Sequence, residues 1–435
     1  MNKHRTAALV VCGAVLFALT VAGLLLQGAD RLNGFLIVAG SQSATYIAAV
    51  WLVWNPPSSR HLVLAIAGAA LAMRIMVALA PPYLSADIYR YVWDGRVVAA
   101  GFNPYRHEPA DPQLESLRDE ALYPQIASKH APSLYPPIAQ VVFFAVTRIS
   151  ESVTAMKLAM VVFDMITILL LIRLLALERL PTARVLVYAW HPLPLWEFAG
   201  SGHIDAVLIA FSVTALWASH QRRTALVGFF LAAATVTKFY PAVLAPALYR
   251  RWDWKFPACF AAAIVIAYLP FLSADWQVIG FLPGYARQEG FDSAGAGFYL
   301  LELLRGSPAF HGLSTGGYEL VAAITLAVVA ASEVFRRDRD RPPYPMAAVL
   351  AVLFMIFVSP HYPWYFCWLI VFPCFVRSFA LLWLTTTCLL LYLVTDYVFA
   401  PSRQLLAVET VMYGPFAALA LIDLWYYRRQ AHLRS

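Results

Sequence analysis

The sequence predicts an all-α polytopic membrane protein, a bundle of transmembrane helices with about 13–15 membrane segments. Hydrophobic residues make up 61% of the 435 residues and charged residues only 13%, about half of the charged share that is usual in a soluble domain. A protein core cannot bury that much apolar sequence, so lipid must solvate the remainder. Long apolar runs also recur along the whole chain between short polar segments, which is typical of membrane-spanning helices.

The apolar runs differ in length. Those long enough to span a bilayer as helices are 6–27, 34–54, 61–80, 156–177, 203–219, 256–273, 316–335, 379–398 and 406–427. Shorter or proline-interrupted runs are 136–150, 184–199, 224–237, 241–250, 344–359 and 362–376. The run 136–150 is predicted to be a short helix that does not fully cross. The run 6–27 has a basic start but no A-x-A-like cleavage site, so we expect a retained span rather than a signal peptide.

The net charge of +7 is carried mostly by short Lys/Arg clusters between apolar runs. This is the pattern of cytoplasmic loops under the positive-inside rule, and it argues against a nucleic-acid partner. We therefore expect a multi-pass protein of the inner (plasma) membrane. The same rule predicts that the motif-rich segments face outward: the long loop 81–135, the turns around 200–205 and 238–241, and the stretches 274–315 and 359–365.

Several classes of site are missing from the sequence. It contains no Walker-type loop, G-x-G-x-x-G fingerprint, H-E-x-x-H or G-x-S-x-G motif. The five cysteines lie within or beside apolar runs, so neither a disulfide framework nor a zinc site is predicted. The chain also lacks a cytosolic domain large enough for a nucleotide-sugar fold. A transferred group would have to come from a donor in the lipid phase.

The loop 81–135 is the richest in polar residues. Asp87, Arg90, Tyr91 and Asp94 fall on one face of a predicted helix that lies along the membrane surface. Two carboxylates would then point toward the mouth of a membrane cavity. The spacing does not decide between a general base and an ordinary ion pair with Arg90.

Two further motifs of this loop are also open to two interpretations. Gly101-Phe-Asn103-Pro-Tyr105 and Tyr135-Pro-Pro137 either contact a substrate or simply form a turn and a proline-rich entry to the next helix.

Three turns on the same predicted side carry polar residues: Gly202-His203-Ile-Asp205, Lys238-Phe-Tyr240-Pro241 and Ser359-Pro-His361-Tyr362-Pro-Trp-Tyr365. A histidine at a helix end is usually structural, and an interfacial lysine usually reaches toward head groups. Three such turns, however, would converge with Asp87 on one cavity. A lysine near a carboxylate base suits a reaction that releases an anionic phosphate.

Charges within the apolar runs, Arg74, Lys157 and Asp164, are costly unless they are paired or face protein. Lys157 and Asp164 share a helical face, and we expect them to form a structural pair rather than to take part in catalysis. The three charges also give some support to a transporter or flippase. The sequence shows no internal repeat, which such a transporter often has. An envelope polymerase or ligase is a further alternative, for which an Arg/His-rich catalytic loop would be expected later in the chain.

The order of these motifs resembles the GT-C superfamily of integral membrane glycosyltransferases. D-x-Y-R-Y-x-W-D-G at 87–95 and G-x-N-P-Y at 101–105 lead to Y-P-P at 135–137, a Lys157 to Asp164 segment, H-P-L-P, G-H-x-D, K-F-Y-P and S-P-H-Y-P-W-Y. The closest likeness is to bacterial mannosyltransferases that use a polyprenyl-phosphate sugar. It covers residues 61–400, a catalytic module that includes the external loop 81–135. Residues 1–60 form an N-terminal two-span addition, and residues 401–435 form the last span and a basic tail.

The resemblance implies an inverting transfer of a sugar, mannose as the best single choice, from a polyprenyl-phosphate donor to a lipid or glycan acceptor on the extracytoplasmic face. In that family an acidic residue of the first outer loop is the general base; Asp87 matches it, and Asp94 is the reserve. Candidate groups for the donor phosphate are Lys238, Tyr240, Arg90 and Arg287. Motif positions that imply substrate contacts are Tyr91, Asn103, Tyr105, Tyr135, His203, Asp205, His361 and Tyr362.

The same resemblance bears on cofactors and on a lid. The loop has a single Asp at 87 rather than an adjacent acidic pair, so no metal site and no cofactor are assigned, and a divalent cation stays open. The stretch 285–302, with Gly295 and Gly297, is either a mobile lid or a simple connection.

Overall fold

The protein is all-helical in the computed structural model, which describes residues 3–28, 30–54, 59–291, 297–336, 342–394 and 403–432. These residues contain no strand, which confirms the predicted fold class. Within these described ranges, seven helices are long and apolar enough to cross a membrane, and shorter apolar helices of 10–17 residues accompany them. The chain is therefore a multi-pass membrane protein.

The long spans are α1 (Lys3–Leu25), α2 (Arg31–Val53), α3 (Arg60–Leu79), α6 (Val153–Leu177), α12 (Lys255–Tyr268) with its 3-10 continuation η6 (Leu269–Ile279), α15 (Thr315–Val334) and α18 (Arg403–His432). The shorter apolar helices are α5 (Pro137–Thr147), α9 (Asp205–His220), α10 (Thr224–Thr235), α16 (Tyr344–Val358), η7 (Pro363–Cys374) and α17 (Phe379–Thr387) with η8 (Cys388–Leu393). Short segments complete the bundle: η3 (Thr182–Val185), α7 (Leu186–Ala189), α8 (Pro192–Pro194), η4 (Leu195–Gly200), η5 (Tyr240–Leu244) and α11 (Ala245–Leu248).

Two of the runs predicted as full spans are shorter than expected. The run 203–219 begins as a helix only at Asp205, because Gly202 adopts a left-handed backbone conformation with φ of 76°. The run 379–398 is α-helical to Thr387 and then continues as the 3-10 helix η8. Its last residues lie outside the described part of the chain.

Serine side chains start several of the helices. The hydroxyls of Ser59, Ser152, Ser314 and Ser378 each accept a hydrogen bond from a backbone N–H in the first turn of α3, α6, α15 and α17. Such caps satisfy donors that a helix start leaves without partners, which matters most where water is scarce.

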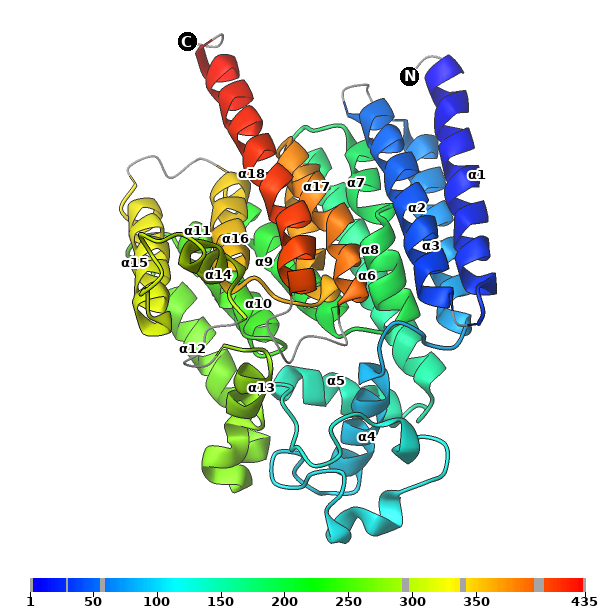
Figure 1. The fold of residues 1–435 in the computed structure, drawn as a ribbon, viewed down its shortest axis with the longest axis vertical. Helices are drawn as coiled ribbons and strands as arrows, with labels where there is room; N and C mark the ends of the chain where they lie inside the picture. The colour runs from blue at the N-terminus through cyan, green and yellow to red at the C-terminus, as the bar shows by residue number, and fades with distance from the viewer. Residues whose placement is uncertain are drawn as a thin grey trace.

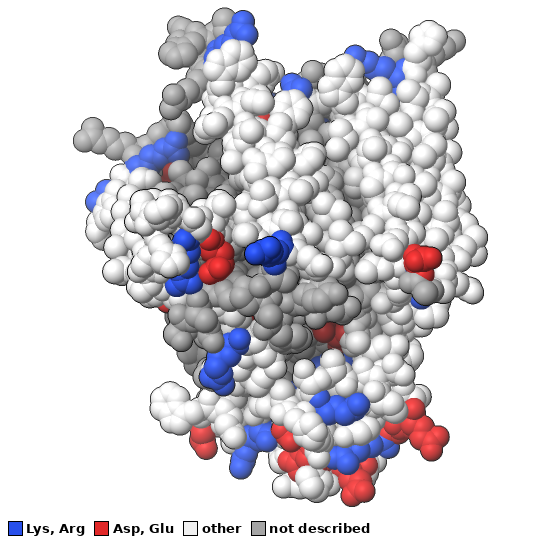
Figure 2. Space-filling view, in the orientation of Figure 1, with Lys and Arg blue, Asp and Glu red and all other residues white. Residues whose placement is uncertain are grey.

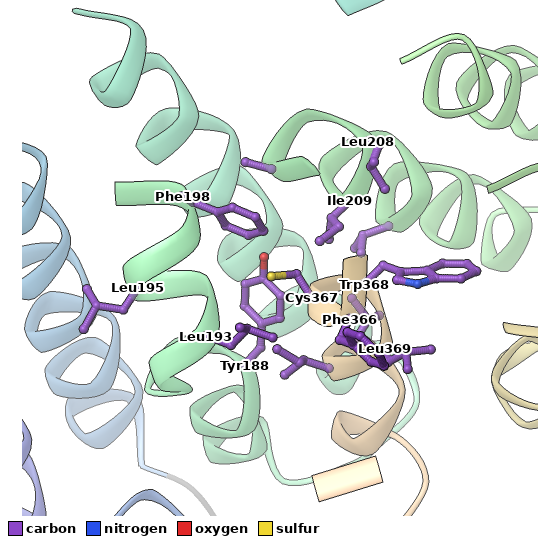
Figure 3. Packing of buried hydrophobic residues seen from close by; sticks show 14 of the residues in the cluster. Tyr188, Leu193, Leu195, Phe198, Leu208, Ile209, Phe366, Cys367, Trp368 and Leu369 are labelled. Carbon is purple, nitrogen blue, oxygen red and sulfur yellow. The ribbon is translucent and has the colours of Figure 1, made fainter. Parts of the chain in front are cut away.

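The core of the bundle surrounds η7. Apart from Tyr365 every residue of Pro363–Cys374 is buried, as expected for a segment that is apolar on all sides. Figure 3 shows Phe366, Cys367, Trp368 and Leu369 of η7 packed together with side chains of 188–198 and with Leu208 and Ile209 of α9. This packing fixes the segments that lead into the 200–205 and 359–365 turns.

The first two helices belong to the same bundle. A Cβ at Gly13 would lie 2.9 Å from the Trp190 ring, so only glycine allows this close approach of α1. The Tyr46 hydroxyl of α2 donates a hydrogen bond to the Val187 carbonyl at 2.7 Å. The described residues of the segment 1–60 are therefore part of the packed bundle.

A separate layer, which we call the outer layer because it forms one edge of the molecule, lies at the end of the bundle opposite the two chain termini (Figure 1). It contains α4 (Asp87–Ala99), α5, and the 3-10 turns η1 (Pro112–Leu117) and η2 (Tyr123–Gln125), with α13 (Leu282–Gln288) nearby. The next helix along the chain, α14 (Tyr299–Arg305), lies beside α16 in the bundle. Figure 2 shows many charged side chains on this layer, whereas the bundle above it presents a broad uncharged surface with scattered charged side chains. At 11 residues α5 is about 16 Å long, too short to cross a hydrocarbon core of about 30 Å, in line with the sequence prediction.

Candidate active site

Asp87 is the first residue of α4 and lies at the junction between the outer layer and the bundle. Its backbone N–H donates to the Ser85 hydroxyl at 3.2 Å, which helps to start the helix at this residue. The side chain is 34% exposed and borders a cavity of about 460 Å³. Burial raises the pKa of the Asp87 carboxyl above its usual range, while Lys238 and a hydrogen bond from Tyr135 act in the opposite direction. These are suitable surroundings for a carboxylate that accepts a proton.

We call this space the polar cavity. Outer-layer and bundle segments that are far apart in sequence form its wall. Its charged and aromatic lining residues are Asp87, Arg90, Tyr135, Lys238, Phe281, Tyr285, Glu289, Tyr362, Trp364, Tyr365 and Tyr392. Of the residues predicted from the sequence, the cavity brings together Asp87, Arg90, Tyr135, Lys238 and Tyr362.

Lys238 follows the end of α10 and is 8% exposed. Its Nζ lies 2.7 Å from Asp205 Oδ2, and 4.5 Å from the centre of the Tyr365 ring. The Tyr240 hydroxyl donates to the other Asp205 oxygen at 2.6 Å. Asp205 is fully buried and does not line the polar cavity, so it serves here as the anchor that holds Lys238 and Tyr240 in place.

A second, mostly apolar space of about 230 Å³ adjoins the polar cavity, and we call it the apolar groove. Its lining residues come from the segments 134–136, 238–240, 282–291 and 354–360 and from Tyr365. Lys238, Tyr135, Tyr285 and Tyr365 line both spaces. Among the described residues Lys238 is the one cation of this shared wall, which also contains the buried carboxylate Glu289.

His203 lies directly behind Asp87. Its Nδ1 is 3.8 Å from Asp87 Oδ2, its Nε2 is 3.4 Å from Glu197 Oε2, and its ring stacks on Trp364 with centroids 3.9 Å apart. Glu197 is fully buried and accepts a hydrogen bond from the Tyr392 hydroxyl at 2.8 Å. The imidazole therefore lies between two carboxyl groups at the floor of the site, and neither ring nitrogen has a hydrogen-bond partner among the described residues.

Glu197, Trp364 and Tyr392 also belong to this site but were not predicted as site residues from the sequence. Glu197 lies in η4, a π-helical turn inside the apolar run 184–199. An acidic residue within such a run is itself a signal of function, and so is a π-helical turn. The acidic residue inside an apolar run could have been recognised from the sequence, in the same way as Arg74, Lys157 and Asp164 were.

Asp94, the reserve candidate for the base, is turned into the interior of the outer layer. It is 1% exposed and binds Arg90 Nε at 2.6 Å, the Ser133 hydroxyl at 2.6 Å and Gln140 at 3.0 Å. The ion pair that the spacing allowed therefore joins Arg90 to Asp94 and not to Asp87. Arg90 Nη2 has no hydrogen-bond partner in the described part of the chain, and the residue borders the polar cavity.

Three more predicted residues hold the outer layer together and do not line the polar cavity. Tyr91 is buried and stacks on Phe143 with ring centroids 4.5 Å apart. The Asn103 amide donates to the Phe271 carbonyl at 3.2 Å, and the Tyr105 hydroxyl donates to the Tyr135 carbonyl at 2.7 Å. They position Tyr135 and the start of α5.

The two remaining predicted residues lie apart from the cavity wall. His361 is buried and contacts Glu289 Oε2 and the Gly297 carbonyl, each at 3.1 Å. Arg287 is exposed on α13 and lines neither space. Gly295, named for the lid, lies outside the described residues.

The charges inside the bundle pair with protein groups. Arg74 forms an ion pair with Asp164, which also accepts from the Tyr188 hydroxyl at 2.7 Å. Lys157 does not pair with Asp164; its Nζ donates to the Val77 and Ala80 carbonyls at the end of α3, at 3.1 and 2.5 Å. These contacts account for the charges that a transporter would place along its path.

The chain matches a family model described as the N-terminal domain of alpha-(1->6)-mannopyranosyltransferases over residues 6–253, more than half of its length. The match includes α1 and α2 as well as Asp87, His203 and Lys238. No curated protein matches the chain.

Proposed function

The chain belongs to the alpha-(1->6)-mannopyranosyltransferase family, and from this premise we propose that it transfers mannose from a polyprenyl-phosphate donor to a hydroxyl group of a lipid or glycan acceptor. It is a membrane glycosyltransferase of the mannosyltransferase type. The proposal adds the donor class, the base and the outer side of the plasma membrane as the place of the reaction.

The observation that carries the proposal is the position of Lys238 where the polar cavity meets the apolar groove. A polyprenyl-phosphate sugar has the same order of parts: a polar sugar, an anionic phosphate and an apolar chain. Lys238 would bind the phosphate, the polar cavity would hold the sugar, and the groove would hold the first part of the prenyl chain. A soluble sugar donor has no apolar chain that could occupy the groove.

In the proposed reaction the acceptor hydroxyl oxygen forms a bond to C1 of the mannose while the bond from C1 to the phosphate oxygen breaks. The hydroxyl proton moves to the Asp87 carboxylate, and the electron pair leaves with polyprenyl phosphate. Because the phosphate is a stable anion, it needs cations such as Lys238 and no general acid, so one carboxylate suffices where glycosidases use two. A single displacement inverts C1, so an alpha product requires a beta-linked donor.

The remaining groups around Asp87 support this chemistry. His203, 3.8 Å from the carboxylate and fixed by stacking on Trp364, would orient Asp87 toward the cavity. The rings of Tyr362 and Trp364 stack on each other with centroids 4.5 Å apart, and both residues line the polar cavity. They would offer an aromatic surface for the sugar. Arg90 adds a guanidinium nitrogen without a partner among the described residues.

The proposal is tested with purified full-length protein, a radiolabelled mannose on polyprenyl phosphate and a mannoside acceptor. Asp87→Asn keeps the size of the side chain but removes the base, so transfer should fall by about 100- to 10,000-fold. Glu120→Gln is the matched control, because Glu120 is an exposed carboxylate of the same loop that does not line the cavity. Full activity of Asp87→Asn would remove Asp87 as the base, and movement of the donor without glycosidic bond formation would remove the enzyme proposal.

A further inference from the structure

A second charged cavity lies at the opposite end of the bundle from the outer layer. It has a volume of about 250 Å³ and is formed where α6, α9, α11 and α15 end and α16 begins. Four arginines line it: Arg222, Arg250, Arg251 and Arg336. None of them belongs to the proposed active site, and the mannosyl transfer gives them no role.

The carboxylates of this arginine cavity are committed to particular partners. Glu333 binds Arg336 at 2.8 Å. Glu178 contacts His220 Nδ1 at 3.0 Å and accepts from the Tyr344 hydroxyl at 3.1 Å. Among the described residues no carboxylate pairs with Arg250 or Arg251, so the positive charges of these two guanidinium groups are not neutralised by that part of the chain.

Two aromatic rings hold the Arg251 guanidinium in place, and its Nε donor makes no hydrogen bond within the described residues. Its guanidinium lies 4.9 Å from the ring centres of both Trp252 and Phe335. Its Nε is shielded from solvent and has no hydrogen-bond partner in the described part of the chain. A guanidinium fixed between aromatic rings presents its N–H groups as a rigid fork that matches the oxygens of a phosphate.

The neighbouring loop indicates the depth of the cavity in the membrane. Trp252 and Trp254 are 75% and 71% exposed, directly after the two arginines. Exposed tryptophans are typical of the level of the lipid head groups. Basic pockets between membrane helices at that level bind anionic head groups.

We propose that the arginine cavity binds the phosphate of an anionic phospholipid through Arg250 and Arg251, as a structural lipid site at the end of the protein remote from the proposed active site. The inference does not depend on the proposed function. A lipid phosphate and free inorganic phosphate would make the same contacts with the two arginines. The exposed tryptophans beside the cavity favour the lipid.

The test measures binding to purified full-length protein in neutral detergent by native mass spectrometry and by thermal shift. The probes are phosphatidylglycerol, phosphatidylcholine with the same acyl chains, and inorganic phosphate. Wild-type protein should bind phosphatidylglycerol saturably, and Arg250→Gln/Arg251→Gln should raise its Kd at least tenfold. Arg60→Gln is the matched control: it removes an exposed cation outside the cavity and should leave the Kd unchanged.

Two single variants are measured in the same way in case the double variant does not fold. Arg250→Gln alone should raise the Kd for phosphatidylglycerol several-fold, and Arg250→Lys should recover only part of the affinity, because lysine keeps the charge but loses the fork. Equal affinity of wild-type and variant proteins for phosphatidylglycerol would overturn the site. A full thermal shift with inorganic phosphate alone, or equal binding of phosphatidylcholine, would overturn the anionic lipid as its ligand.

Discussion

Replacement of Lys238 by methionine separates the proposed phosphate contact from the structural ion pair. Lys238 is 8% exposed, and its Nζ lies 2.7 Å from Asp205. At about 4 Å and an effective dielectric constant of about 20, a lysine and a phosphate charge attract each other by about 4 kcal/mol. At about 1.4 kcal/mol per tenfold change, Lys238→Met should lower kcat/KM roughly a thousandfold.

The same change also leaves the buried Asp205 without its cation, which should destabilise the fold by about 3–5 kcal/mol. The double variant Lys238→Met/Asp205→Asn removes both charges and should recover most of that stability, read as the Tm in detergent. It should not recover transfer from the polyprenyl-phosphate donor. A double variant with near wild-type turnover would refute the phosphate role and leave Lys238 only as the partner of Asp205. Lys129→Met, in a loop lysine that does not line the polar cavity, is the control.

Three further results are expected. Because burial raises the pKa of Asp87, and the base acts unprotonated, kcat/KM should fall as the pH is lowered through this raised pKa and should level off above it; a rate that increases toward acid pH would contradict the assignment. Gly202→Ala would place a Cβ 2.2 Å from Ile88 Cδ1 at a φ of 76°, so the Tm should fall by the equivalent of about 1–3 kcal/mol, and an unchanged Tm would contradict the packing. Asp164→Asn leaves Arg74 buried without its carboxylate and should cost about 3–5 kcal/mol of stability with an unchanged KM for the donor; the reverse pattern would favour a transport path through these charges.

The helices were predictable from the sequence to within a few residues because the bilayer imposes one simple requirement on each span. A stretch of about 20 apolar residues must satisfy its backbone internally, so it forms a helix wherever it occurs. The predicted run 156–177 corresponds to α6 (Val153–Leu177), and 316–335 to α15 (Thr315–Val334). The shorter runs were harder to place because turns such as that at Gly202 depend on packing against Ile88 and Lys157.

The candidate site was predictable only in part. Arg90 is three residues from Asp87 and four from Asp94, so both carboxylates are within its reach on a helix. Asp94 pairs with it because Ser133 and Gln140, from distant parts of the loop and α5, add hydrogen bonds to the same carboxylate. The spacing of residues within one helix does not predict such contacts with distant segments.

A similar reason explains the different placement of two histidines from similar turns. His203 lies behind Asp87 because the π-helical turn η4 and Trp364 hold its ring there. His361 instead contacts Glu289 and Gly297, which come from the segment after α13. The order of motifs was nevertheless sufficient for the family, and the match over residues 6–253 confirms the mannosyltransferase resemblance.

The size of the apolar groove has a consequence for donor selection. At about 230 Å³ it is smaller than the usual sites of about 300–1,000 Å³ that enclose a whole drug-sized ligand. In the proposed reaction only the isoprene units next to the phosphate would contact protein, and the rest of the chain would remain among the acyl tails of the bilayer. Donors with short and long prenyl tails should then compete on equal terms, provided that their first units have the same double-bond geometry. The enzyme would recognise the isoprene units next to the phosphate, and its affinity for the donor would not depend on the length of the remaining prenyl chain.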